Sequence, residues 1–205
     1  QETKIRIMRA SFTGELGYEI YIAPKYGLEL WRKIFSCGKV FNLIPYGTET
    51  MHLLRAEKGY IVVGQETDGT VTPIDLNYNW MIGKNKKDFI GKRSLSRPDT
   101  ARNDRKQLVG LSPVDKSDEI EEGQHIVEIN KLPKKIKSPI KYLGHVTSSY
   151  HSPNLNQSIG LAMIKGGNNL LGQRFFVTVS GKTKNIPVEI VNPVFIDPEN
   201  QRLIS

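Results

Sequence analysis

Apolar and polar residues alternate near the start of the chain, over 5–10 and again over 17–23, and this period of two predicts two β-strands. Apolar residues then recur at helical spacing over 25–37 and over 47–58. Each helical run is followed by a glycine, which is a common helix stop. A short apolar run, 60–63, predicts a further strand. The first part of the chain therefore mixes helices and strands, as α+β proteins do.

The middle of the chain is less regular. Residues 74–83 fit either a helix or a strand, and 89–95 have the pattern of a connector that docks on the rest of the fold. The run 97–106 is polar and poor in apolar residues, which is typical of a domain boundary. We therefore expect one domain over 1–96, a linker over 97–106 and a second domain over 107–205.

Beyond the linker the pattern changes to short apolar runs separated by turn residues. Regular short strands with turns between them are typical of a small antiparallel barrel or a sandwich. The predicted strands are 108–111, 125–129, 142–148, 159–164, 175–179 and 187–194.

Composition indicates a folded globular protein, since 38% of the 205 residues are hydrophobic and 24% are charged. No apolar run approaches the roughly 20 residues that cross a bilayer, so we expect no membrane span. The single cysteine, Cys37, excludes an intrachain disulfide and is expected to be a packed thiol. The four histidines have none of the spacings of zinc sites. We expect a cytoplasmic protein without a metal site.

A net charge of +8 raises the question of nucleic-acid binding. The lysines cluster over 84–87 and 134–137, in segments that resemble turns, and no zinc-finger or RRM pattern accompanies them. A solvated basic surface is the better interpretation, and we expect no nucleic-acid partner. A basic rim can also steer an anionic small ligand toward its site.

Glu15 stands between Gly14 and Gly17, in the turn that joins the first two predicted strands. Glycine lets the backbone turn sharply, so this carboxylate can be aimed at a ligand. Its two acceptor oxygens suit a cyclic ligand edge with two adjacent N–H donors, such as the pterin edge of a folate. The alternative is an exposed turn residue without a ligand, which the short motif taken alone favours.

Arg55 lies one turn before the glycine that ends the second predicted helix. A cation there stabilises the helix dipole without any ligand, and it could instead hold an anionic group of a ligand by paired hydrogen bonds. Among the aromatic residues, Trp31 has the helical spacing of a core residue. Tyr60 and Trp80 lie near Arg55 and the following loop, and they are candidates for stacking on a planar ring.

Segments from nearly the whole chain resemble, in order, the glycine-cleavage T-protein family. Each segment is ordinary alone, and their common order makes the resemblance specific. In the first half they are Ser11-Phe-Thr-Gly-Glu-Leu-Gly-Tyr-Glu-Ile20, Leu54-Arg-Ala-Glu-Lys-Gly59, Thr72-Pro-Ile-Asp75 with Trp80, and Asp88-Phe-Ile-Gly-Lys-Arg-Ser-Leu95. In the second half they are 106–111, 122–123, 144–149, 152–153, 159–162 and 193–195. The stretches 46–52, 58–73 and 144–153 favour the branch of sarcosine oxidase α subunits.

This resemblance implies part of a ferredoxin-like folate-binding domain followed by a C-terminal antiparallel β-barrel. It places Glu15 at the family's pterin-contacting glutamate and Arg55 at its ligand-site arginine. The family's N-terminal half, which holds an aspartate near the folate, is not in this chain, and we expect the chain to be a piece of a longer polypeptide. The family's C-terminal ligand tyrosine has no evident match over 195–201. No catalytic residue can therefore be named.

The resemblance also implies a function. In such oxidases a flavin on a partner β subunit oxidises sarcosine, and this module transfers the one-carbon unit to tetrahydrofolate, giving 5,10-methylene-tetrahydrofolate. Glycine and hydrogen peroxide are the other products. Flavin and NAD are expected elsewhere in the complex, together with the other oxidase subunits. Two alternatives remain open: a stand-alone aminomethyltransferase or folate-dependent demethylase, and a non-catalytic folate-binding or basic interaction module.

Overall fold

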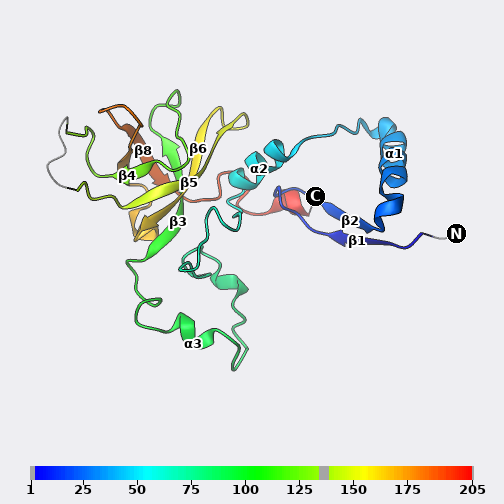
Figure 1. Cartoon of the computed structure of the whole chain (residues 1–205), viewed down its shortest axis with the longest axis horizontal. Coiled ribbons are helices and arrows are strands. Elements are labelled where there is room, and N and C mark those ends of the chain that lie inside the picture. The colour runs from blue at the N-terminus through cyan, green and yellow to red at the C-terminus, as the bar shows by residue number, and fades with distance from the viewer. Residues whose placement is uncertain (1–2, 134–138, 205) are drawn as a thin grey trace.

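The computed structural model describes residues 3–133 and 139–204, so the lysine cluster at 134–137 lies outside the described residues (Figure 1). The first part of the chain contains β1 (Ile5–Arg9), β2 (Tyr18–Ile22), α1 (Gly27–Gly38), α2 (Thr48–Glu57) and the short α3 (Lys92–Leu95). The second part contains β3 (Lys106–Pro113), β4 (His125–Val127), β5 (Gly144–Ser152), β6 (Gln157–Lys165), β7 (Arg174–Val177) and β8 (Ile186–Val191).

The six later strands form a closed antiparallel barrel in the order β3-β6-β5-β4-β7-β8, and β8 pairs back onto β3. Closure leaves none of the described barrel strands at a free sheet edge. The α+β class and the C-terminal barrel are thereby confirmed, and the barrel is chosen over the sandwich. The barrel begins at Lys106, inside the predicted linker. The division into domains over 1–96 and 107–205 stays a prediction.

Strand β6 is apolar on both faces because both faces are covered. Successive side chains of a strand point to opposite sides. Ala162 and Ile164 lie in the core inside the barrel. Leu161 and Met163 lie in a second core outside the barrel, which also contains Ala56 of α2. The last turn of α2 is therefore held against the outer wall of the barrel.

Helix α2 ends at Glu57, and Gly59 follows its C-cap with a φ of +71°, a conformation that favours glycine. A Cβ on Gly59 would lie 2.6 Å from the carbonyl oxygen of Pro193, so the C-terminal segment approaches the chain closely there. This close approach brings the chain after β8 to the end of α2.

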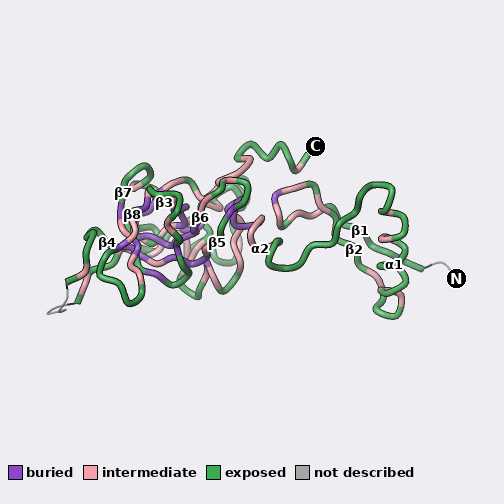
Figure 2. The backbone as a smooth tube through the Cα atoms, turned by 90° about the horizontal axis from the view of Figure 1, so that it is seen from above, coloured by how far each residue is buried: buried purple, intermediate pink, exposed green. Residues whose placement is uncertain are grey.

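The hairpin β1–β2 and α1 project away from the barrel, and each of their residues is exposed or only partly buried (Figures 1 and 2). The prediction that Trp31 is a core residue is wrong for this structure, because its exposed fraction is 58%. Cys37, expected to be packed, is exposed as well. Trp31 does share one face of α1 with Phe35, at 4.6 Å between ring centroids. The helix is amphipathic as expected, but the described residues bury its apolar face only in part.

The strand predicted over 60–63 is also wrong. The amide of Tyr60 donates to the carbonyl oxygen of Arg55 at 2.8 Å, and the amides of Gln65 and Glu66 both donate to that of Val62. The carbonyl of Tyr60 accepts from the Arg55 side chain, and the amide of Val62 donates to the Glu66 carboxylate. These backbone groups form hydrogen bonds with nearby residues, so they do not pair with another strand.

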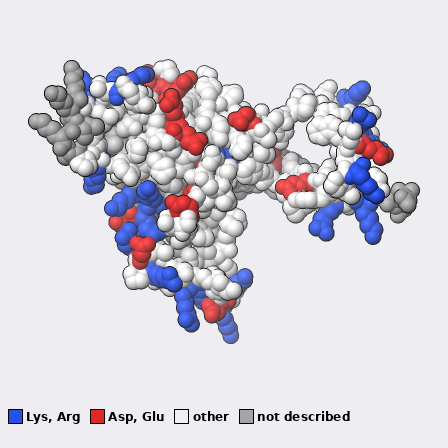
Figure 3. Space-filling view, viewed as in Figure 1, with Lys and Arg blue, Asp and Glu red and all other residues white. Residues whose placement is uncertain are grey.

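Basic and acidic side chains are interspersed on the face seen in Figure 3, where lysines and arginines around the α3 region stand beside aspartates. Arg102 pairs with both Asp99 and Asp104 in that region. Mixed charge of this kind favours a solvated surface over a uniform binding face for nucleic acid.

Candidate functional site

Arg55 is completely buried, with an exposed fraction of 0%. Helix α2 carries its guanidinium into the interface with the barrel. One terminal nitrogen, Nη1, donates to the carboxylate of Glu66 and to the carbonyl of Tyr60, both at 3.1 Å. The other, Nη2, donates to Ser148 Oγ at 2.7 Å and to Gln65 Oε1 at 2.9 Å. Among the described residues, Nε has no hydrogen-bond partner. The guanidinium is thus held almost entirely by protein groups.

Glu66 balances this buried charge. Its Oε1 accepts hydrogen bonds from Thr147 Oγ1, at 2.9 Å, and from Ser148 Oγ. Adjacent residues of a regular strand point to opposite faces, but the register of β5 shifts between Val146 and Ser148. The bulge lets two consecutive hydroxyl groups reach one carboxylate. The hydroxyl groups of β5 therefore hold the Arg55–Glu66 ion pair in place by hydrogen bonds.

Glu15 lies at the surface, with 46% of its side chain exposed. Its Oε1 accepts a hydrogen bond from Nη1 of Arg202 at 2.9 Å. The turn rests on the aliphatic part of Lys58, and a Cβ on Gly14, whose φ is +82°, would lie 2.7 Å from that side chain. Glu15, Lys58, Asp197 and Arg202 line one small cleft. Gly14 is required there both for its backbone conformation and for its lack of a side chain.

We expect Gly14→Ala to destabilise the protein by about 1–3 kcal/mol, because alanine is strained at this φ and its methyl group displaces Lys58. Urea denaturation measures the change. Gly69→Ala is a control with open space at its Cβ position and no positive φ. Equal midpoints for the two variants would show that the turn tolerates a side chain.

Tyr60 and Trp80 line a larger groove of about 710 Å³ beside the cleft. Tyr78 contributes a third ring, with its centroid 5.8 Å from that of Trp80 and its plane tilted by 57°. Trp80 is 74% exposed and is therefore accessible to a ligand. Burial, followed by the Asp197 carboxylate, raises the pKa of Tyr60, so its phenol is neutral and able to donate near neutral pH. The groove offers flat apolar surface with hydrogen-bond donors at its edge.

The four predicted ligand residues are only partly brought together. Tyr60 and Trp80 share the groove, and Glu15 lies in the adjoining cleft, with Lys58 lining both. Arg55 lines neither and is buried behind them. Direct contact between Arg55 and a ligand requires that it exchange one of its present partners.

Asp75, which is buried, forms an ion pair with the partly buried Arg105 at the start of the barrel. Both Nε and Nη2 of Arg105 donate to the Asp75 carboxylate, at 2.9 to 3.1 Å, and Nη1 donates to Asp99 at 2.9 Å. Burial acts to raise the pKa of Asp75, but hydrogen bonds from Arg105 and Thr72 outweigh it and leave the pKa below its usual value. This pair ties the polar run before β3 to the loop that precedes it.

We expect Asp75→Asn to lower the free energy of unfolding by about 1–2 kcal/mol at neutral pH. The folded-state pKa is depressed, so the ionised carboxylate stabilises the fold above its unfolded-state pKa, and this is lost as pH falls through the folded-state pKa. The gap between wild type and variant should therefore close in acid. Urea titrations at neutral pH and in acid measure this gap, and Asp104→Asn, at an exposed carboxylate, is the control. A gap that does not change with pH would contradict this electrostatic origin.

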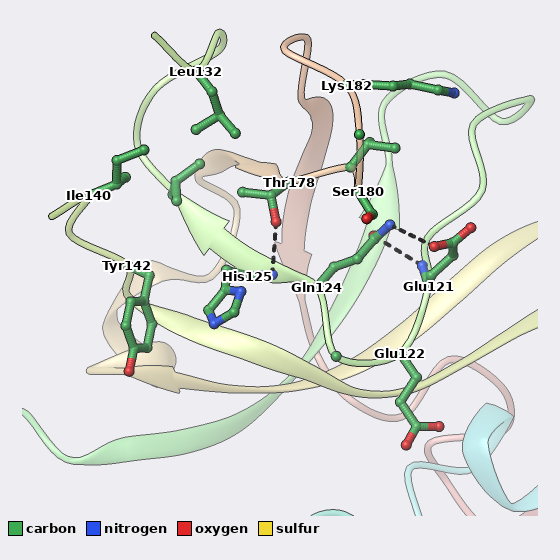
Figure 4. Close-up of a pocket in the computed structure, with 14 residues that line it drawn as sticks. Glu121, Glu122, Gln124, His125, Leu132, Ile140, Tyr142, Thr178, Ser180 and Lys182 are labelled. Carbon is green, nitrogen blue, oxygen red and sulfur yellow. Dashed lines mark hydrogen bonds between the residues drawn. The ribbon is translucent and has the colours of Figure 1, made fainter. Parts of the chain in front are cut away.

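Another cavity, of about 630 Å³, lies beside strand β4 (Figure 4). His125 and Tyr142 stack edge to face beside it, with ring centroids 4.8 Å apart. Gln124 and Glu121 are joined by hydrogen bonds at its opposite side. None of the predicted ligand residues lines this cavity.

The described residues also bear on other classes of site. They contain no group of three or more His, Cys, Asp or Glu side chains that could hold a metal ion. Nor does the described part of the chain contain a helix long and apolar enough to cross a membrane.

Three residues that contact the predicted site residues were not predicted from the sequence. Glu66 is the partner of Arg55, and Asp197 and Arg202 come from the C-terminal segment. The local signal for Glu66 was the polar pair Gln65-Glu66, which follows the apolar run 60–63 after one glycine. The contacts of Asp197 and Arg202 span 139 and 187 residues, so no local pattern could indicate them.

These features define a class of protein: an α+β part joined to a closed antiparallel barrel, with an aromatic groove and a carboxylate cleft where they meet. Family models agree with this class. The GCVT N-terminal domain matches residues 1–86, and the glycine cleavage T-protein C-terminal barrel domain matches residues 106–197. The chain belongs to the glycine-cleavage T-protein family.

Two kinds of relatives are similar to the chain. The sarcosine oxidase α subunit of Corynebacterium sp. (strain U-96) is 47% identical over 197 residues, which are 96% of this chain and 20% of the relative. That of Rhizobium meliloti (strain 1021) is 37% identical, with the same shares. An aminomethyltransferase of Clostridium botulinum (strain Kyoto / Type A2) is 33% identical over 87% of this chain and 45% of its own length. The chain thus spans about one fifth of the oxidase relatives.

A solved structure supports the fold. The glycine cleavage system aminomethyltransferase T from Bartonella henselae matches 94% of this chain and 50% of its own chain, with a TM-score of 0.78 and 22% sequence identity.

Proposed function

We propose that this chain is the folate-binding module of a sarcosine oxidase α subunit, acting within a cytoplasmic, heterotetrameric complex. The observation that carries the proposal is the pairing of an accessible carboxylate, Glu15, with an adjoining groove lined by Tyr60 and Trp80. The 47% identity to a sarcosine oxidase α subunit over 96% of this chain favours this branch of the family.

The residues fit a reduced folate chemically. A pterin is flat and presents two adjacent N–H donors, for which the two oxygens of a carboxylate are suitable acceptors. Glu15 would accept from this edge. Trp80 would stack on a ring, and the neutral phenol of Tyr60 would donate a hydrogen bond. The groove of about 710 Å³ is in the size range of small-molecule sites.

Arg55 would act behind this surface. Its bond to the Tyr60 carbonyl fixes the backbone of a groove residue. We propose that it contacts the ligand only if its long 3.4 Å contact with the Tyr150 hydroxyl, or another of its bonds, is given up. No catalytic acid or base is assigned to this chain.

The proposed reaction transfers one carbon. A flavin on a partner β subunit would supply the two-electron oxidation of sarcosine, with oxygen as the final electron acceptor and hydrogen peroxide as its product. Tetrahydrofolate bound to this module accepts the carbon of the resulting imine, which gives glycine and 5,10-methylene-tetrahydrofolate. NAD is expected elsewhere in the complex. This chain's residues bind and orient the folate.

The second candidate is a stand-alone aminomethyltransferase or folate-dependent demethylase. The 33% identity to an aminomethyltransferase over 87% of this chain favours it. The two candidates share the folate site and differ in the partner, since only the oxidase requires a flavoprotein subunit. A folate-binding module without catalysis is the third alternative.

The test is turnover of sarcosine by the intact complex, with and without tetrahydrofolate. Tetrahydrofolate should divert the carbon from formaldehyde to 5,10-methylene-tetrahydrofolate, while the yield of hydrogen peroxide stays the same. Oxidation with unchanged formaldehyde would contradict a transfer role for this module. No oxidation of sarcosine, with folate still bound, would favour the second or third candidate.

A further inference from the structure

The C-terminal segment 193–204 runs from the barrel back to the turn that holds Glu15 (Figure 1). The backbone carbonyl of Glu57 accepts the amides of Phe195 and Ile196, at 2.9 and 3.0 Å. The Lys58 ammonium pairs with the Asp197 carboxylate at 3.1 Å, and both side chains are almost buried. The end of α2 therefore anchors this segment at two points.

Asp197 then shapes the turn that follows. Its Oδ1 accepts the amide of Gln201 at 2.9 Å, and its Oδ2 accepts the amide of Arg202 at 3.1 Å. One carboxylate thus joins the Lys58 anchor to the backbone of Arg202. These hydrogen bonds fix the position of the Arg202 backbone, from which its side chain extends.

Arg202 contacts the Glu15 turn in two ways. Its Nη1 donates to Glu15 Oε1 at 2.9 Å, and its carbonyl oxygen accepts the amide of Leu16 at 2.9 Å. The Glu15 side chain and the backbone after it are both held from one residue. Since the pair is about half exposed, it contributes little to global stability.

We propose that Arg202 is a positioning residue, which holds the Glu15 carboxylate in the orientation that reads the paired N–H donors of a ligand. The inference rests on the proposed function and deepens it. An unrestrained glutamate loses rotamer freedom when it binds, whereas a pre-oriented one has already lost it. Arg202 would therefore improve both affinity for a reduced folate and selectivity for the N–H pattern.

The experiment is calorimetric titration of 5-formyl-tetrahydrofolate into the full-length polypeptide and its Arg202→Ala variant. We expect the variant to bind about three- to fivefold more weakly. Arg202→Lys should recover part of this loss. Arg9→Ala is the matched control, because Arg9 donates to the carbonyl of Leu203 in the same segment and lies outside the Glu15 cleft. It should bind as the wild type does.

Two further readouts separate positioning from a structural role. In a Glu15→Gln background, Arg202→Ala should have no additional effect, because it acts through Glu15. The second readout is the ratio of affinities for 5-formyl-tetrahydrofolate and its 2-desamino-2-methyl analogue, which lacks the exocyclic N–H donors. Arg202→Ala should reduce this ratio.

Independent, additive losses for the two variants would overturn the inference, as would an unchanged affinity ratio. Tighter binding by Arg202→Ala would also overturn it, since Arg202 would then compete with the ligand for Glu15. In all these cases the wild type still binds folate and the proposed function stands. Failure of the wild type itself to bind folate would contradict both the positioning role of Arg202 and the proposed function.

Discussion

Arg55→Met is expected to lower the free energy of unfolding by about 3–5 kcal/mol. The substitution removes the positive partner of Glu66 and leaves that carboxylate buried without its ion pair. In the wild type the guanidinium donates hydrogen bonds to Ser148 Oγ and to the Tyr60 carbonyl, and the substitution leaves both acceptors without them. Urea denaturation followed by circular dichroism measures the change.

Arg32→Met on α1 is the matched control, because Arg32 is exposed. It should change the free energy of unfolding by at most about 0.5 kcal/mol. The double variant Arg55→Met, Glu66→Leu should recover much of the loss, because removing both charges leaves neither one unpaired. A loss below about 1 kcal/mol for Arg55→Met would contradict this account of a buried pair.

Glu15→Gln is expected to weaken binding of a reduced folate by about 2–3 kcal/mol, or roughly 30- to 150-fold. Glutamine keeps the shape of the side chain but replaces one of the two acceptor oxygens with an amide donor. That donor would face the N–H groups of the pterin edge, and the charge that strengthens the hydrogen bonds would be lost. Titration of 5-formyl-tetrahydrofolate into the full-length variant measures the effect.

Glu19→Gln provides the control, because Glu19 is a nearby carboxylate on β2 and is exposed. It should leave the affinity unchanged. If Glu15→Gln and Glu19→Gln bind equally well, Glu15 is not part of the folate site, and the cleft has another role.

The barrel could be predicted because its information is local. Apolar runs bounded by turn residues mark most of its strands, although β5 is rich in hydroxyl groups. The double-sided burial of β6 explains the run from Ile159 to Ile164. Helix α2 could be predicted for the same reason, since its apolar spacing and the glycine after it are contained in a single short stretch.

The rest depends on contacts between distant residues. Residues 60–63 have the composition of a strand, yet their backbone groups form hydrogen bonds with the Arg55 and Glu66 side chains instead of with another strand. Trp31 has core spacing, but burial depends on what covers α1. Glu15 could be singled out from its glycines, whereas its partner Arg202 comes from the other end of the chain. Periodicity carries no information about such pairs.

The most direct measurement is calorimetric titration of 5-formyl-tetrahydrofolate into the full-length polypeptide that contains this chain. The proposed folate module predicts saturable binding of one folate per chain, with a dissociation constant of about micromolar order. No heat of binding to a polypeptide that circular dichroism shows to be folded would contradict the central claim. The family resemblance would then extend to the fold alone, and an interaction module would become the better explanation.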